Sequence, residues 1–593
     1  MSSTKMGAPE EHMVEVVKGD SEIIHKHDVL DLANDIQDVK PSATTPAMFK
    51  LYLILSIGYF CIILQGYDGS LMGAINAMPQ YLDYYGLKSA SSSTGLVFAI
   101  YNIGAIAALP ISGPLNDTFG RRWGMFAGAA LVIFSTCIQA PATSKAMFLA
   151  GRFFVGFGQG FLNVAGITYV SEMAHPHWRG PLSAFLETNY FVGSILASWV
   201  TYGTAYMSGT ISFRLPVWLQ MVSSGYIVLG VFFCPESPRW LMAQDRYAEA
   251  EAVLATYHGE GSRLSPFVRL QLAEMRAQIS SDGSDKRWWD YRDLFMTAAA
   301  RRRLICVVGF AWFGQYSGNA LVSYYFPVIV EQTGITNPHT QLLLNALNPV
   351  VSWIAAILGS LLSDRVGRRP LLLGGFTGCA LCLAVVTGLT KVSVTSGGAA
   401  AGHAGIFFIY LFSVVFSFCL TPLQPFYISE CLTTETRAKG NALGQIVASI
   451  AGVVGQYTTG VAISNIGYYY YLVFVFWDCF EVLVTYLFFP ETKGRTLEEI
   501  NEIFNDPHPV KKSLERKDAT GVLHATLKGL SVVSYGSMVY CLWSVVYWAC
   551  AKGQGITLAI EISGVACMGP PNGAMIEQMS NVAETAQSQG ANP

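Results

Sequence analysis

The stretch Gly113-Pro-Leu-Asn-Asp-Thr-Phe-Gly-Arg-Arg122 decides how the rest of the chain is organised. It is a short charged segment between two long apolar runs. It returns as Leu362-Ser-Asp-Arg-Val-Gly-Arg-Arg369, with an acid, a Gly and two Arg in the same order. The two acids are 364 − 117 = 247 residues apart. A tight polar turn between apolar runs indicates two membrane helices joined on one side of the bilayer, and its return indicates a duplicated membrane domain.

The composition also indicates a membrane protein. The chain has 593 residues, of which 52% are hydrophobic and 13% charged, and its mean hydropathy is +0.38. A soluble domain usually carries roughly 25% charged residues. The net charge of −3 identifies no charged partner, so we expect no nucleic acid. The twelve Cys have no metal or disulfide spacing, and we expect no bound metal.

Twelve apolar runs precede residue 491, each near the roughly 20 residues that a helix needs to cross a bilayer. They begin near residues 51, 94, 123, 147, 182, 216, 304, 342, 370, 405, 440 and 467. Irregular backbone cannot face lipid, so these runs should be helices. The sequence therefore predicts an all-α membrane protein with twelve transmembrane helices in two pseudo-symmetric six-helix bundles.

The Lys and Arg residues orient the chain, because loops rich in them stay cytoplasmic. Most lie in one set of loops, which places the N-terminus and the chain after the twelfth span in the cytoplasm. The expected segments are an N-terminal tail (1–50), a first bundle (51–234), a linker (235–303), a second bundle (304–490) and a C-terminal tail (491–593). Within the tail, residues 498–504 predict a short amphipathic helix.

An uncharged run of 22 residues, Leu530–Ala551, is long enough to span the bilayer but has no counterpart in the repeat. It is a thirteenth span, an interfacial or loosely packed tail, or a segment foreign to the authentic protein.

Further landmarks recur in the same order. Glu172 precedes Arg179 by seven residues, and Glu430 precedes Arg437 by the same step, 430 − 172 = 258 residues later. A Pro-Glu pair closes both the sixth span and the twelfth, with Glu236 and then Glu491. Three matched landmarks in one order indicate that the duplication covers both bundles.

These motifs stand together along residues 50–500: both charged turns; Gly151-Arg152 with Glu172 and Arg179-Gly180; Pro235–Leu241; Glu430 with Arg437; and Pro490–Gly494 continuing to Thr496–Glu499. As a set they resemble the sugar porter family of the major facilitator superfamily. Gly66–Gly73, Ser317-Gly-Asn319 with Tyr324-Tyr325, and Thr421–Gln424 resemble its fungal lactose permease and cellodextrin transporter branch. The resemblance implies the major facilitator fold, a central sugar site between the bundles and alternating access, often with proton symport.

Asp68 lies inside the first span, where a carboxylate costs several kcal/mol unless it is paired or hydrated. In the family that Asp68 resembles, the matching acid accepts the proton, and Arg152 matches its partner. A nearby guanidinium keeps the acid ionised, and separation of the two would raise its affinity for a proton. The alternative is a fixed ion pair between the first and fourth spans.

The resemblance also implies a cytoplasmic gate of charged residues that latches the two halves in the outward-facing state. The alternative is static anchoring of the turns. The gate candidates are Asp117, Gly120, Arg121, Arg122, Glu172, Arg179, Glu236, Arg239, Asp364, Gly367, Arg368, Arg369, Glu430, Arg437 and Glu491.

A sugar needs hydroxyl partners and aromatic faces, which the seventh span offers around Ser317-Gly318, where a helix break could expose backbone. Gln315 and Tyr324 match sugar-binding positions of the family. In the fifth span, Glu187 stands where hexose porters carry Gln. It binds sugar, serves as a second proton site, or marks another substrate. The substrate candidates are Glu187, Gln315, Asn319, Tyr324, Tyr325, Asn348 and Gln445.

Gly314 and Ala320 are smaller than the family's residues, which leaves room for a disaccharide. We therefore expect a monomeric plasma-membrane sugar transporter, not an enzyme. The expected activity is proton symport of a sugar such as lactose or cellobiose, without a cofactor other than the proton as coupling ion. The alternatives are a sugar sensor that transports poorly and a passive sugar facilitator.

Overall fold

The computed structural model describes residue 42 and residues 44–262, 265–282, 291–396, 399–433, 436–495 and 497–515. Its secondary structure in these ranges is helical. The run Leu530–Ala551 lies outside the described residues.

Six membrane-crossing segments form the first bundle. The first span, α3 (Pro46–Ile75), begins at Pro46, whose fixed φ suits the first helical turn, and the Thr45 hydroxyl accepts a hydrogen bond from the Met48 amide. Short α4 (Pro79–Tyr85) follows it. The segments are α3 (Pro46–Ile75), α5 (Ser92–Phe119), α6 (Arg121–Gln139), α7 (Lys145–Met173), α8 (Arg179–Thr204), and α9 (Ile211–Trp218) with α10 (Gln220–Gly230).

The second bundle repeats this plan with more breaks. Its first segment is divided into three helices, and Pro422 stands at the break in its fourth. The segments are α14 (Ala298–Tyr316) with α15 (Asn319–Tyr324) and α16 (Phe326–Gln332), α17 (Pro338–Val366), α18 (Arg368–Ser396), α19 (Ala399–Cys419) with α20 (Leu423–Cys431), α21 (Arg437–Ile466) and α22 (Tyr470–Phe488).

Eight described segments are long and apolar enough to cross a membrane by length and composition, one of them covering both α21 and α22. The predicted spans that are not among these eight segments include broken or more polar helices, and the repeat identifies them as spans. Together with the repeat, the helices confirm the predicted twelve-helix, two-bundle class.

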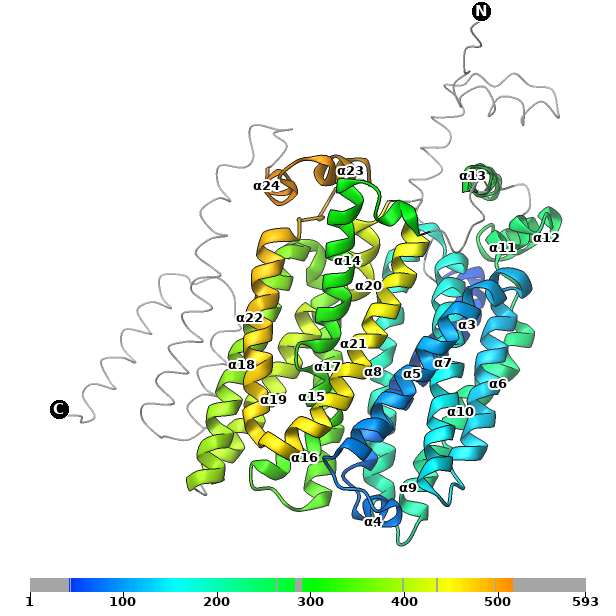
Figure 1. Ribbon diagram of the computed structural model, residues 1–593. Helices are drawn as coiled ribbons and strands as arrows, with labels where there is room; N and C mark the ends of the chain where they lie inside the picture. Colours follow the sequence, from blue (N-terminus) through cyan, green and yellow to red (C-terminus); the bar gives the residue numbers. More distant parts are fainter. Residues whose placement is uncertain are drawn as a thin grey trace, which may run out of the picture. The chain divides into compact units, whose positions relative to one another are not determined.

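The two bundles meet along pairs of helices from opposite halves. The helix α5 packs against α21, and α8 packs against α17. A Cβ added at Gly73 of α3 would lie 2.8 Å from the main-chain oxygen of Ser323, and one at Gly460 would lie 2.7 Å from that of Ser91. These glycines permit close approach of the bundles at the end that carries α4, α9 and α16 (Figure 1).

The linker and the described part of the tail lie at the opposite end, beside the charged turns (Figure 1). The linker contains α11 (Pro238–Ala243), α12 (Tyr247–Tyr257) and α13 (Pro266–Asp282). The tail contains α23 (Leu497–Asn505) and α24 (Pro509–Leu514). The helix α23 buries Ile500, Ile503 and Phe504, in agreement with the amphipathic pattern.

Candidate functional site

The two charged turns have the same atomic plan. Gly120 and Gly367 adopt φ values of 98° and 109°, which favour glycine, and each precedes a helix. Glu236 accepts hydrogen bonds from the main-chain N–H of Arg121 (3.0 Å), and Glu491 accepts one from that of Arg368 (3.0 Å). Each carboxylate therefore caps the N-terminus of a helix, where a negative charge is favourable.

Each turn also contains a bidentate ion pair between an arginine and a glutamate. The Arg121 guanidinium donates to both oxygens of Glu172 at 3.0 Å. The Arg368 guanidinium donates to both oxygens of Glu430 at 2.9 and 3.3 Å. The repeat extends to one tyrosine in each bundle. The Tyr169 hydroxyl of α7 donates to the Pro235 main-chain oxygen, and the Tyr427 hydroxyl of α20 donates to that of Pro490. The duplication seen in the sequence is thus preserved in the contacts.

Other predicted gate residues surround these pairs. Arg122 donates to the main-chain oxygens of Val231 and Phe232, and Arg369 donates to that of Tyr486. Asp117 pairs with Arg121 at 3.4 Å. The other predicted arginines lie at the same end: Arg179 and Arg239 are exposed, and Arg437 is half-buried. The side chain of Asp364 lies outside the described residues.

In the described part of the chain, the gate ion pairs join residues of the same bundle, Arg121 to Glu172 and Arg368 to Glu430. The latch between the two halves therefore stays a prediction for another state of the molecule.

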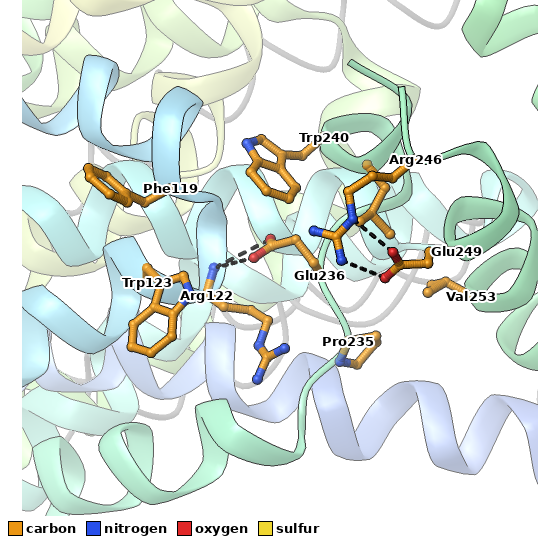
Figure 2. Close-up of a pocket in the computed structure, with 10 residues that line it drawn as sticks. Phe119, Arg122, Trp123, Pro235, Glu236, Trp240, Arg246, Glu249 and Val253 are labelled. Carbon is orange, nitrogen blue, oxygen red and sulfur yellow. Dashed lines mark hydrogen bonds and ion pairs between the residues drawn. The ribbon is translucent and has the colours of Figure 1, made fainter. Parts of the chain in front are cut away.

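A hollow at the charged end of the first bundle lies between α5, α6 and the linker helices (Figure 2). Glu236 reaches into it and accepts from the Arg122 main-chain N–H, while Arg246 pairs with Glu249 at 2.6 Å across the rim. Burial raises the pKa of Glu236, although its main-chain donors oppose this shift. Glu236 and Arg246 both have partners within the protein. We therefore interpret the hollow as part of the structure that supports the charged turn.

Asp68 and Arg152 meet in the interior of the first bundle. Both side chains are buried, at 0% and 1% exposure. The Arg152 guanidinium donates to the main-chain oxygen of Asp68 (3.3 Å) and lies 4.9 Å from the centre of the Tyr101 ring. Within the described structure, neither carboxylate oxygen of Asp68 has a hydrogen-bond donor. The acid and its predicted partner are therefore adjacent without direct contact between their charged groups.

The seventh span breaks where the sequence predicted. The helix α14 ends at Tyr316, Gly318 adopts a φ of 83°, and α15 begins at Asn319. Tyr324 is half-buried, with its ring 5.4 Å from Phe98 of the other bundle.

Tyr325 occupies a different place from its neighbour. Its side chain is fully buried, and its hydroxyl donates to the Gln456 main-chain oxygen (3.1 Å). Its ring lies 5.1 Å from Phe98 across the seam between the bundles. These contacts give Tyr325 a packing role in this state.

Glu187 lines a small cavity between the bundles. Its other lining residues come from α8, α17 and the α19–α20 break: Thr188, Ala356, Ser360, Thr421, Pro422 and Phe426. Among the described residues, no hydrogen-bond partner of Glu187 is found.

The remaining substrate candidates lie on helices of the second bundle. Gln315 is half-buried near the end of α14, Gln445 of α21 is exposed, and the Asn348 amide oxygen on α17 is buried without a donor among the described residues. Next to Gln315, a Cβ at Gly314 would lie 2.7 Å from the Gln424 amide nitrogen, which donates to the Gly314 oxygen. Gln424 therefore occupies the space that the small residue leaves.

Sequence reasoning missed Asp478 and Glu481 in the twelfth span. Both side chains are 0% exposed. The signal was present, since Trp477-Asp-Cys-Phe-Glu481 places two acids inside an apolar run, where ionisable residues are rare.

Comparisons with known proteins agree with this architecture. The family model "Sugar (and other) transporter" matches residues 54–504, so the chain belongs to this family of membrane transporters. It is 29% identical over 481 residues to a high-affinity glucose transporter of Kluyveromyces lactis, covering 78% of this chain and 87% of that protein. It is 28% identical over 468 residues to the MFS-type transporter criB of Aspergillus cristatus, covering 78% and 96%.

Among solved structures, the chain is similar to a partially occluded inward-open conformation of the xylose transporter XylE from E. coli. The TM-score is 0.64 at 20% identity, over 75% of this chain and 99% of XylE. This likeness supports the major facilitator fold. The protein is a multi-pass membrane sugar transporter of the major facilitator superfamily, and its substrate is a small-molecule sugar. It belongs to a family of transporters, not of enzymes.

Proposed function

We propose that the protein is a proton–sugar symporter that works by alternating access, with Asp68 as the proton carrier. The observation that carries the proposal is the buried Asp68 carboxyl, which has no hydrogen-bond donor among the described residues, while Arg152 binds the main-chain oxygen of Asp68. A buried carboxyl without a donor is more stable with a proton than as an anion. A small movement of the guanidinium onto the carboxylate would reverse that preference, because a nearby positive charge favours the ionised form.

The close packing of the two bundles at one end of the molecule supports alternating access to the sugar site from the two sides of the membrane. The close backbone contacts at Gly73 and Gly460 join the bundles at the end predicted to face outside. The ion pairs at the charged end stay within their own bundles. In the opposite state, we propose that charged gate residues exchange partners across the two halves.

For the substrate we propose a disaccharide such as lactose or cellobiose. Glu187, Thr188, Ser360 and Thr421 place one carboxyl and three hydroxyls around one small cavity, and we propose that it widens in another state of the molecule to admit the sugar. Gln315, Asn319 and Tyr324 lie at the helix break of the second bundle. Asn348 adds an amide oxygen without a donor. Gln445 and Tyr325 remain weaker candidates for contact with sugar.

The experiment is uptake of labelled lactose and cellobiose at acid and neutral pH, in a host without its own sugar transporters. We expect faster uptake at acid pH in the wild type and loss of this dependence in Asp68→Asn. Competition by a panel of mono- and disaccharides identifies the sugar class. Equal pH dependence in the wild type and Asp68→Asn would contradict coupling through this residue.

The two alternatives predict different results. A passive facilitator equilibrates sugar but does not accumulate it, so a protonophore would leave the sugar level unchanged. A sensor needs a partner-binding segment, and residues 505–593 are long enough to supply one. Truncation after Glu515 would then abolish a sugar response while uptake continues.

We propose that the chain works as a monomer in the plasma membrane with a cytoplasmic N-terminus. The positive-inside distribution of Lys and Arg supports this orientation. Protease protection of an N-terminal epitope in intact cells tests the orientation, and cleavage from outside would contradict it.

A further inference from the structure

The second bundle contains a pair of buried acids that the coupling scheme above does not use. Asp478 and Glu481 lie three residues apart on α22, near the middle of this helix of 19 residues. Both are 0% exposed, and in the described structure both Asp478 oxygens and Glu481 Oε1 lack a donor. One turn further along the helix, the buried Thr485 hydroxyl is also without a partner there.

In the part of the chain that the structure describes, no cation pairs with these acids. The helices packed against α22 include α14, α18 and α21. Among the described residues, the Cys379 thiol of α18 interacts electrostatically with both acids, and α14 contributes the Ser317 hydroxyl. Among the described residues, no Lys, Arg or His forms an ion pair with either carboxyl. Two neighbouring anions buried in an apolar interior are strongly unfavourable, so the pair must hold at least one proton.

The hydrogen bonds of Ser317 indicate where a proton resides. The Ser317 hydroxyl is within hydrogen-bonding distance of Glu481 Oε2 (2.8 Å) and of the Phe313 main-chain oxygen. A hydroxyl has one hydrogen to donate. Both contacts can be hydrogen bonds at once if Glu481 is protonated and donates to Ser317, which in turn donates to Phe313.

Loss of that proton changes the end of α14. An ionised Glu481 is an acceptor only, so the Ser317 hydroxyl must turn to it and release the Phe313 oxygen. Ser317 is the residue that caps α14, and it directly precedes Gly318, where the span breaks. Beyond the break, Ser323 and Tyr324 of α15 lie against Gly73 of α3 in the other bundle. The protonation state is therefore connected to the contact that closes the bundles.

We propose that Asp478 and Glu481 form a second proton-binding site, which takes up and releases a proton as the break at Ser317-Gly318 changes conformation during transport. The inference rests on the proposed transport function, but it does not depend on coupling through Asp68.

The test is infrared difference spectroscopy of the purified full-length protein titrated from about pH 5 to about pH 9, which separates protonated carboxyls from carboxylates. We expect a protonated-carboxyl signal that is lost on titration in the wild type and in Asp68→Asn. When Asp478→Asn and Glu481→Gln are added to Asp68→Asn, in which the Asp68 carboxyl no longer contributes, the signal should become smaller. Ser317→Ala should move its loss to higher pH, because the carboxylate then lacks its donor.

An unchanged signal when the two substitutions are added to Asp68→Asn, or one that persists over the whole titration in the wild type, would overturn the proposal. Sugar exchange in proteoliposomes supplies the second readout. The wild type should lose exchange at alkaline pH, and Glu481→Gln should keep it there. Equal alkaline loss in both would also overturn the proposal. The infrared result does not require sugar movement, so it distinguishes failure of this site from failure of the transport function.

Discussion

The Arg152 guanidinium donates to the main-chain oxygen of Asp68 at 3.3 Å, and the Asp68 carboxylate receives no hydrogen bond in the described structure. The arginine is thus held beside the acid without neutralising it. The guanidinium also lies 4.9 Å from the centre of the Tyr101 ring. A guanidinium that can turn from a main-chain oxygen to a carboxylate provides a physical means to release a proton.

Replacement of Arg152 by Lys should reduce transport at least about tenfold. Lysine keeps the charge but loses the planar group that reaches both the Asp68 oxygen and the Tyr101 ring. The measurement is initial uptake rate, normalised to protein at the membrane. Tyr101→Phe is the matched control, because it keeps the aromatic face and should retain most activity. Near-normal uptake by Arg152→Lys would contradict the geometric role of the guanidinium.

Gly367→Ala should destabilise the protein by about 2 kcal/mol. Its φ of 109° disfavours a side chain, and a Cβ would lie 2.7 Å from Glu491 Oε2. Gly374→Ala, in the interior of α18 with no atom within 4 Å of its Cβ, is the control and should be neutral or stabilising. Thermal unfolding in detergent checks both. Gly120→Ala should behave like Gly367→Ala, and a different result would deny the structural repeat.

Arg121→Ala and Arg368→Ala should each cost about 2 kcal/mol of stability, because each leaves a partly buried glutamate without its two-pronged donor. Arg246→Ala removes an ion pair whose side chains are 48% and 58% exposed, and should cost under about 1 kcal/mol. Unfolding midpoints of the three variants provide the comparison. Equal losses would mean that burial does not distinguish these pairs.

Acidification should destabilise the contact between the loop after α7 and the linker, where the His175 ring lies 5.0 Å from the rings of His258 and Phe267. Burial, together with His258, His177 and Arg179, lowers the pKa of His175 to about 3. The unfolded chain therefore binds a proton below about pH 6.5 that the folded chain excludes. This contribution is complete above that pH and falls as pH drops toward the folded value, by about 1 kcal/mol at pH 5.5.

The measurement for His175 is the shift in melting temperature between about pH 7.5 and about pH 5.5. The His175→Gln variant should have a smaller acid shift than the wild type, because it has lost the group that titrates. An equal shift in both would show that other groups govern acid sensitivity.

Local patterns predicted the architecture well. The charged turns and the twelve apolar runs follow from hydropathy, charge and the repeat. The tail helix follows from the spacing of Ile500, Ile503 and Phe504. These features depend on short-range rules that the sequence displays directly.

Contacts between residues far apart in the chain were harder to predict from the sequence. The glycine at position 120 indicated a turn. No local pattern predicted that Glu236 caps the helix that begins at Arg121, 115 residues earlier in the chain. Adjacent Tyr324 and Tyr325 look equivalent in sequence, yet the break at Gly318 sends Tyr325 into a packed seam. The acids of α22 were visible in the sequence, although their link to Ser317 required the packing of α14.

The central claim is that sugar and proton move together through Asp68. The most direct measurement is the internal pH of proteoliposomes that contain the purified protein, recorded as an inward lactose or cellobiose gradient is applied. We predict that sugar entry acidifies the wild-type vesicles, and that Asp68→Asn exchanges sugar without acidification. Sugar entry by the wild type at constant internal pH, or acidification that persists in Asp68→Asn, would contradict the claim.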